Sequence, residues 1–166
     1  MLFKNKNYPI LIDEEGGSVS RLKKFIDNSI FSSEYFGNLY LKNRKIFNIY
    51  FEIYVKQISY LLNLLGINLN TVPVLDLRRK KSHKIIGNRS FSFDKKIVSA
   101  IGNICVSKFQ SNRIGTIIKH IPGHGLAKVD SHKKLPSITK NYSYLLNNDF
   151  STFRNKKSLF AMTAHV

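Results

Sequence analysis

Short apolar runs that end in polar residues recur four times along the chain. They cover residues 10–12, 67–76, 117–120 and 158–166. Short and nearly continuous apolar runs are typical of strands that are buried on both faces, as in parallel sheets. The pattern therefore predicts four strands of one parallel sheet.

Three segments with apolar residues at helical spacing separate these runs. The segment 44–65 is followed by Gly66 as a C-terminal cap, 94–112 starts at Asp94 as an N-cap, and 142–153 forms the third. Strands that alternate with helices predict an α/β fold with a parallel sheet. The absence of a linker or low-complexity tract predicts one domain over residues 1–166. The connecting loops are expected at 16–37, 78–93 and 122–138.

Each apolar run carries polar side chains at its carboxyl end. In β/α barrels the active site lies at the carboxyl ends of the strands. We therefore expect the polar residues that end the runs to lie together at one end of the barrel, where the carboxyl ends of the strands meet. They are Asp13, Asp76, Lys119, His120 and His165.

Composition and charge are those of a globular protein with an excess of lysine. Hydrophobic residues make up 43% of the 166 residues, charged residues 22%, and the net charge is +17. A nucleic-acid partner is one interpretation of this charge. Because the lysines are scattered in short groups, a solvated surface is favoured and no nucleic-acid partner is expected.

Targeting signals and cysteine usage predict a cytoplasmic protein without a membrane partner. No run reaches the roughly 18 apolar residues of a membrane span, and the start of the chain does not resemble a signal peptide. The single Cys105 cannot form an internal disulfide, which agrees with a reducing compartment.

Three of the five histidines lie between residues 119 and 136. Asp130 and His132 are two positions apart, so in an extended loop they face the same side. A carboxylate can then fix the imidazole tautomer while the other ring nitrogen exchanges a proton with substrate. A solvated loop with a chance pair is the alternative. Zinc held by the three histidines is another, but Pro122 and Gly123 disfavour the helix that the spacing of His120 and His124 would need. We expect no metal and no cofactor.

Other charged residues allow several roles before any family is considered. The three acids at 13–15 could perform acid/base chemistry, hold sugar hydroxyls or cap a helix. Arg89 could bind a carboxylate or hydroxyl groups, or pair with an acid at the surface.

Taken together, the motifs resemble those of family 3 glycoside hydrolases. In chain order they read IDEEGG with a following arginine, PVLD, IGNRSF, KHIPGHG and VDSH. The KHxPGHG segment with a downstream DSH is similar to the bacterial β-N-acetylglucosaminidase branch, whose enzymes act in peptidoglycan recycling. The resemblance implies a partial (β/α)8 TIM-type barrel of about four β/α units, corresponding to strands two to five.

The resemblance also assigns roles and a mechanism. It implies that His132 is the general acid/base and that Asp130 orients it. It implies that His124 shapes its loop, and it gives His165 no role. Sugar binding falls to Asp13, Arg21, Arg89, Lys119 and His120.

The family hydrolyses by a retaining double displacement on an aspartate nucleophile in a segment resembling SDDL, which these 166 residues do not contain. We therefore expect an N-acetylglucosamine-containing sugar as ligand, but no hydrolysis by the isolated chain. A complementary half-barrel chain or self-association would cover its open edges. A catalytically inactive or split-enzyme sugar-binding fragment is the alternative to the enzyme.

Overall fold

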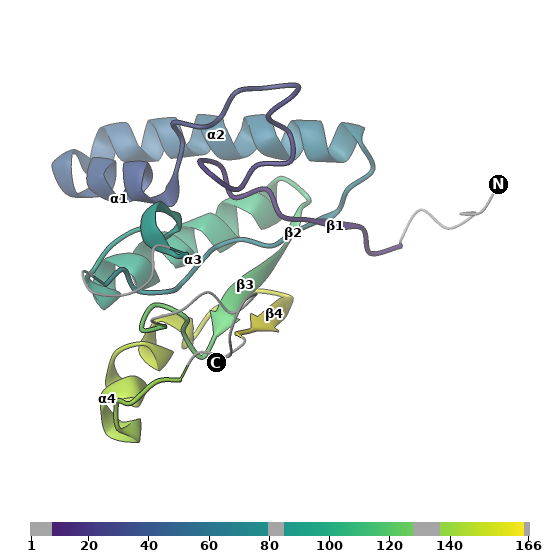
Figure 1. Cartoon of the computed structure of the whole chain (residues 1–166). Coiled ribbons are helices and arrows are strands. Elements are labelled where there is room, and N and C mark those ends of the chain that lie inside the picture. The colour runs from purple at the N-terminus through teal and green to yellow at the C-terminus, as the bar shows by residue number, and fades with distance from the viewer. Residues whose placement is uncertain (1–7, 80–84, 128–136, 165–166) are drawn as a thin grey trace.

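Four parallel strands form one sheet in the order β1–β2–β3–β4 (Figure 1). The computed structural model describes residues 8–79, 85–127 and 137–164. The strands are β1 (Leu11–Ile12), β2 (Leu69–Asn70), β3 (Gly115–Ile121) and β4 (Phe160–Thr163). Every neighbouring pair is parallel, which confirms the fold class predicted from the alternating runs.

Helices connect each strand to the next. The connections hold α1 (Ser33–Lys42), α2 (Arg44–Leu64), the 3-10 helix η1 (Gly87–Arg89), α3 (Lys95–Ser111), α4 (Tyr142–Asn147) and the 3-10 helix η2 (Phe150–Phe153). Helices α1, α2 and α3 contact one another and lie on the same side of the sheet (Figure 1). The sheet and this helical layer enclose the hydrophobic core.

The two long helices form where the apolar spacing predicted them. On α2, Phe47, Val55 and Leu62 are fully buried, at intervals that keep them on one face of the helix. The helix ends at Leu64, and Gly66 beyond it has the φ of +73° that a glycine after a helix end supplies. The side chain of Asp94 accepts the N–H of Lys96 at 2.7 Å, which confirms this residue as the N-cap of α3.

Helix α1 lies partly inside the segment 16–37 that was predicted as a loop, so that prediction is wrong at its end. Ser32 caps the helix, because its Oγ accepts the N–H of Tyr35 at 3.2 Å. Phe36 and Tyr40 then bury one face of the helix. Gly37 allows close approach, since a Cβ built there would lie 1.7 Å from the Phe91 carbonyl oxygen.

The second predicted strand is much shorter than its apolar run. Regular pairing ends after Asn70, and beyond it Val74 forms only an isolated bridge with Lys119. Pro73 has no N–H to donate to a ladder, which is why the run cannot continue as a regular strand. The segment stays extended alongside β3, because the N–H of Leu75 still donates to the Lys119 carbonyl at 2.8 Å.

The third predicted helix, 142–153, is divided into α4 and η2. Asn141 caps α4, since its side chain accepts the N–H of Tyr144 at 2.8 Å. Helical geometry ends at Asn148, with φ −117° and ψ −83°. The Oγ1 of Thr152 then donates to the Leu75 carbonyl at 2.8 Å, which ties η2 to the segment after β2.

The two outer strands expose apolar side chains. Leu11 of β1 is 56% exposed and Phe160 of β4 is 55% exposed, whereas Ile117 and Ile118 of β3 are buried. Burial on both faces is thus confirmed for β3 and wrong for the outer strands, each of which pairs with one neighbour among the described residues.

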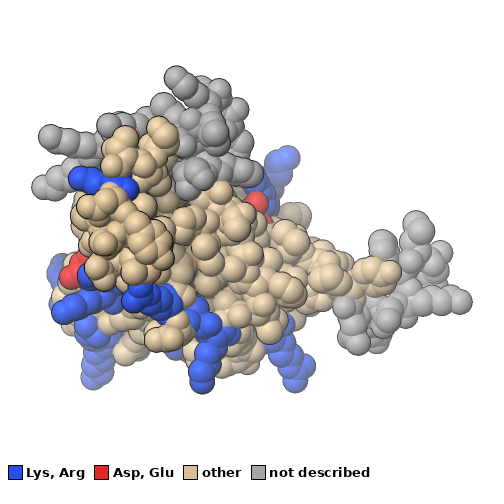
Figure 2. Space-filling model, turned by 90° about the horizontal axis from the view of Figure 1, so that it is seen from below, with Lys and Arg blue, Asp and Glu red and all other residues tan. Residues whose placement is uncertain are grey.

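Two further findings concern the surface. The face in Figure 2 carries its Lys and Arg side chains mainly along its border, and not in a dense central patch. Among the helices within the described ranges, none is long and apolar enough to cross a membrane.

Candidate active site

Lys119 of β3 lies at the centre of a buried charge cluster. Its Nζ is 2.9 Å from the Asp13 Oδ1, 2.7 Å from the Thr71 Oγ1 and 2.5 Å from the Glu15 Oε1. The Thr71 hydroxyl in turn donates to Asp13. An ammonium group has three N–H donors, so the cluster uses the full capacity of Lys119, whose side chain is only 2% exposed.

Glu15 joins Lys119 to a second cation, Arg89. The Nε of Arg89 donates to the Glu15 Oε2 at 2.8 Å and its Nη2 donates to Oε1 at 2.9 Å. Such two-pronged pairing fixes the plane of the guanidinium. The short helix η1 brings Arg89 over the site, where its Nη1 also donates to the Ile85 carbonyl at 3.1 Å. Glu15 is thus a buried anion held between two cations.

Asp76 holds the next group of the cluster. Its Oδ2 lies 2.6 Å from the Nδ1 of His120, and its Oδ1 accepts the backbone N–H of His124 at 2.6 Å. The Nε2 of His120 lies 3.4 Å from the Nη2 of Arg89. One buried carboxylate therefore connects the segment after β2 to both the end of β3 and the loop that follows it.

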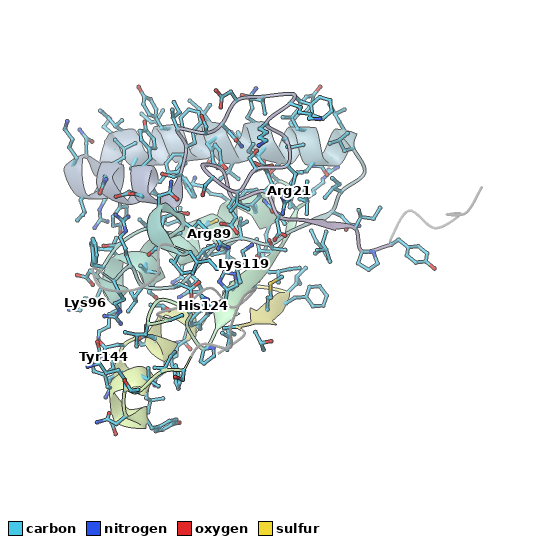
Figure 3. All side chains as sticks on the ribbon, viewed as in Figure 1. Arg21, Arg89, Lys96, Lys119, His124 and Tyr144 are labelled. Atoms are coloured by element: carbon cyan, nitrogen blue, oxygen red, sulfur yellow. The ribbon has the colours of Figure 1, made fainter. Side chains whose placement is uncertain are left out.

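Asp13 and Arg21 form the open side of the cluster. The Oδ2 of Asp13 lies 3.9 Å from the Nη2 of Arg21, and the two side chains are 39% and 63% exposed. Figure 3 shows Arg21, Arg89 and Lys119 in the same region beside the strands, away from Lys96 and Tyr144. A cavity of about 290 Å³ lies here. Its lining includes Asp13, Arg21, Arg89, Lys119, His120 and Met162.

Glu14 fixes the loop that carries Arg21. Its Oε2 accepts the backbone N–H groups of Arg21 at 2.7 Å and of Leu22 at 2.9 Å. Its Oε1 accepts from the Asn28 side chain at 2.6 Å. Of the three acids that the sequence places together, Asp13 faces the cavity, Glu15 holds the cations and Glu14 shapes the loop.

The pKa values of the acids follow from this environment. Burial alone would raise the pKa of Glu15, but hydrogen bonds and charges from Arg89 and Lys119 outweigh it and lower the pKa below its ordinary value. The pKa of Asp13 is also lowered, because the hydrogen bonds from Thr71 and Lys119 outweigh the effect of burial. Both groups therefore stay ionised near neutral pH.

These shifts predict a stability that declines in acid. A carboxyl group with a lowered pKa in the folded state stabilises the protein above its unfolded pKa, and this contribution is lost as pH falls through the folded pKa. For Glu15 the decline begins near the ordinary value of 4.5. We expect the free energy of unfolding, measured by urea denaturation between pH 6 and pH 3, to fall most steeply below about pH 4.5. A free energy that stays constant through this range would contradict the ion pairs.

The structure brings together the five residues for which sugar binding was predicted. Asp13, Arg21, Arg89, Lys119 and His120 all line the cavity. Asp130, His132 and His165 lie outside the described residues, so their predicted positions stay predictions. Within the described part of the chain, no three His, Cys, Asp or Glu side chains lie close enough to hold a metal ion.

Thr71 and Glu15 are the contributors to the cluster that sequence reasoning did not assign. Glu15 was one of three adjacent acids with several open roles, and Thr71 had no signal beyond its place in an apolar run. Asp76 was expected among the polar residues at the carboxyl ends of the strands, but its partner was not identified. These residues lie at or after the carboxyl ends of neighbouring strands, and this shared location is the signal in the sequence that points to contacts among them.

The parallel sheet, the helices that connect its strands and the charged cavity beside them have the arrangement of part of a β/α barrel. The sequence model of one protein family, described as "Glycosyl hydrolase family 3 N terminal domain", matches residues 8–166 of this chain. The chain therefore belongs to glycosyl hydrolase family 3.

Relatives and solved structures agree with this assignment. Beta-hexosaminidase A of Pseudoalteromonas piscicida is 32% identical over 161 residues, which are 95% of this chain and 26% of that protein. A beta-hexosaminidase of Aromatoleum aromaticum is 30% identical, over 95% of this chain and 45% of its own. The structure of NagZ from Neisseria gonorrhoeae in complex with N-trifluoroacetyl-D-glucosamine has a TM-score of 0.78 at 27% identity, with 95% of this chain and 46% of that chain covered. The chain thus spans less than half the length of these proteins.

Proposed function

We propose that this chain is the sugar-binding and acid/base part of a β-N-acetylhexosaminidase. Its ligand is a terminal β-linked N-acetylglucosamine, and the source of that sugar is an oligosaccharide derived from peptidoglycan. The observation that supports this most strongly is Asp13. One of its carboxylate oxygens is fixed by Lys119 and Thr71, while the other faces an open cavity.

A carboxylate arranged in this way suits a sugar. Hydroxyl groups donate hydrogen bonds to an ionised acceptor, and such charge-assisted bonds are stronger than neutral ones. Arg21 and Arg89 add donors for the hydroxyl oxygens at the same cavity. The relatives named beta-hexosaminidase, together with the NagZ structure that holds a glucosamine derivative, support N-acetylglucosamine as the sugar.

The chemistry proposed is a retaining double displacement. An aspartate attacks the anomeric carbon while His132 protonates the departing oxygen, and water then hydrolyses the glycosyl-enzyme with His132 as the base. Asp130 accepts a hydrogen bond from the imidazole and stabilises its protonated form. These 166 residues contain no SDDL-like segment for the nucleophile. We therefore expect the isolated chain to bind the sugar without turning it over.

Hydrolysis of N,N′-diacetylchitobiose tests this function in the protein purified from the cells that make it, together with the chain that supplies the nucleophile, because the isolated 166 residues are expected not to turn the sugar over. The leaving group is a poorly acidic sugar hydroxyl, so the reaction depends on the general acid. We expect His132→Ala to lower the rate by about 10²–10⁴-fold. The control is His83→Ala, which removes a histidine outside all of the motifs. Full activity of the His132→Ala protein would contradict the proposed mechanism.

A complementary half-barrel chain or a second copy is the proposed protein partner. The outer strands support this, because Leu11 and Phe160 are more than half exposed at the two edges of the sheet. Exposed strand edges with apolar side chains promote pairing with other chains. We expect the isolated 166-residue polypeptide to sediment as a dimer or larger species in analytical ultracentrifugation. A monomer that melts sharply would contradict this proposal.

A further inference from the structure

We propose that Asp76 is a positioning residue that holds His120 in the tautomer protonated on Nδ1, so that Nε2 is presented as an acceptor at the sugar cavity. The identity of the sugar rests on the function proposed above. The tautomer itself follows from the contacts of His120 and can be tested without any ligand.

The first contact is with Asp76. This carboxylate is 1% exposed, and its Oδ2 lies 2.6 Å from the Nδ1 of His120. An ionised carboxylate only accepts hydrogen bonds, so the proton of this bond belongs to Nδ1. A buried partner at this distance also restricts rotation of the ring.

The second contact, which is longer, favours the same tautomer. The Nε2 of His120 faces the Nη2 of Arg89 at 3.4 Å, which is a long contact. A guanidinium only donates, and it is fixed in place because Glu15 binds it through two nitrogens. A proton on the Nε2 of His120 would face an N–H of Arg89, and two donors cannot form a hydrogen bond with each other. Both neighbours of His120 therefore favour a lone pair on Nε2.

The substitution Asp76→Asn separates this role from a structural one. The Oδ1 of Asp76 also accepts the N–H of His124 at 2.6 Å, and an asparagine oxygen can keep that bond. The asparagine NH₂ group then faces the Nδ1 of His120 and needs an acceptor there. Because the contact with residue 76 is short at 2.6 Å and the contact with Arg89 is long at 3.4 Å, the first dominates, and His120 should switch to the tautomer protonated on Nε2 while the loop after β3 stays attached.

The ring nitrogens of His120 can be observed directly by long-range ¹H–¹⁵N NMR at neutral pH, with His120→Gln used to assign the signals. We expect the Nδ1-protonated form in the wild-type protein and the Nε2-protonated form in Asp76→Asn. The matched control is Asp149→Asn, which alters another buried carboxylate, one that pairs with Arg79 at 2.8 Å. It should lower the melting temperature without changing the His120 tautomer. An Nε2-protonated wild type, or an unchanged tautomer in Asp76→Asn, would overturn the proposal.

Titration with N-acetylglucosamine tests the consequence for binding. We expect Asp76→Asn to weaken affinity about tenfold, as the loss of one well-placed hydrogen bond does. In a His120→Ala background the same substitution should change affinity less than twofold, because the two residues act as a unit. Equal losses in both backgrounds would show that Asp76 acts only on the structure and would overturn the proposal. A wild-type protein that binds no sugar would instead refute the proposed function, and the NMR spectra would still decide the tautomer.

Discussion

Replacing Asp13 with alanine should weaken the binding of N-acetylglucosamine about a hundredfold. A hydrogen bond to a charged group contributes about 1.5–3 kcal/mol, and the open side of this carboxylate can accept from two neighbouring hydroxyls. The substitution also removes one of the three partners of Lys119, which is 2% exposed and cannot turn to water without rearrangement. Isothermal titration calorimetry with the free sugar measures the change.

Asp27→Ala is the matched control for this experiment. It removes the same charge from an exposed position, where Asp27 accepts the backbone N–H of the nearby Ser29 at 3.0 Å. Affinity should change less than twofold in this variant, since a distant exposed charge is screened by salt. If Asp13→Ala binds the sugar as tightly as Asp27→Ala, Asp13 does not contact the ligand.

Replacing Glu15 with glutamine should destabilise the folded protein by about 3–5 kcal/mol at neutral pH, the cost of leaving a buried ion pair without one partner. Glu15 is held between Lys119 at 2.5 Å and Arg89 at 2.8 Å, and all three side chains are at most 16% exposed. Glutamine keeps the shape but leaves two cations facing each other. Urea denaturation of the two proteins gives the difference in unfolding free energy.

Glu52→Gln provides the comparison for Glu15→Gln. Glu52 also pairs with two lysines, Lys56 at 3.1 Å and Lys108, but it lies on the helical surface and is 33% exposed. Exposed pairs contribute no more than about 1 kcal/mol. Equal losses for the two variants would mean that burial of the Glu15 cluster does not determine its energy.

The parts of the fold that depend on repeated patterns could be predicted from the sequence. The apolar spacing of α2 and α3 extends over several turns, and its caps Gly66 and Asp94 are local signals. Helix α1 was missed because it is only ten residues long and its pattern includes Gly37, a poor helix former. Gly37 is needed there because it allows the close contact with the Phe91 backbone. The division of 142–153 likewise depends on a distant group, the Leu75 carbonyl that accepts from Thr152.

The candidate site could be predicted as a set of residues but not as a network. Strand ends that meet at one edge brought Asp13, Lys119 and His120 together, as the β/α pattern implies. The pairing of Glu15 with Arg89 joins residues 74 positions apart, and nothing local in either segment specifies the partner. The same holds for Asp76 and His120, which are 44 positions apart.

A crystal structure of the protein grown with N-acetylglucosamine tests the central claim most directly. The distance to be measured is that between the sugar hydroxyl oxygens and the Oδ2 of Asp13. The account predicts a sugar in the cavity beside Arg21 and Arg89, with at least one hydroxyl within hydrogen-bond distance of that oxygen. A sugar bound at another place on the surface, with the Asp13 cavity filled only by water, would contradict it.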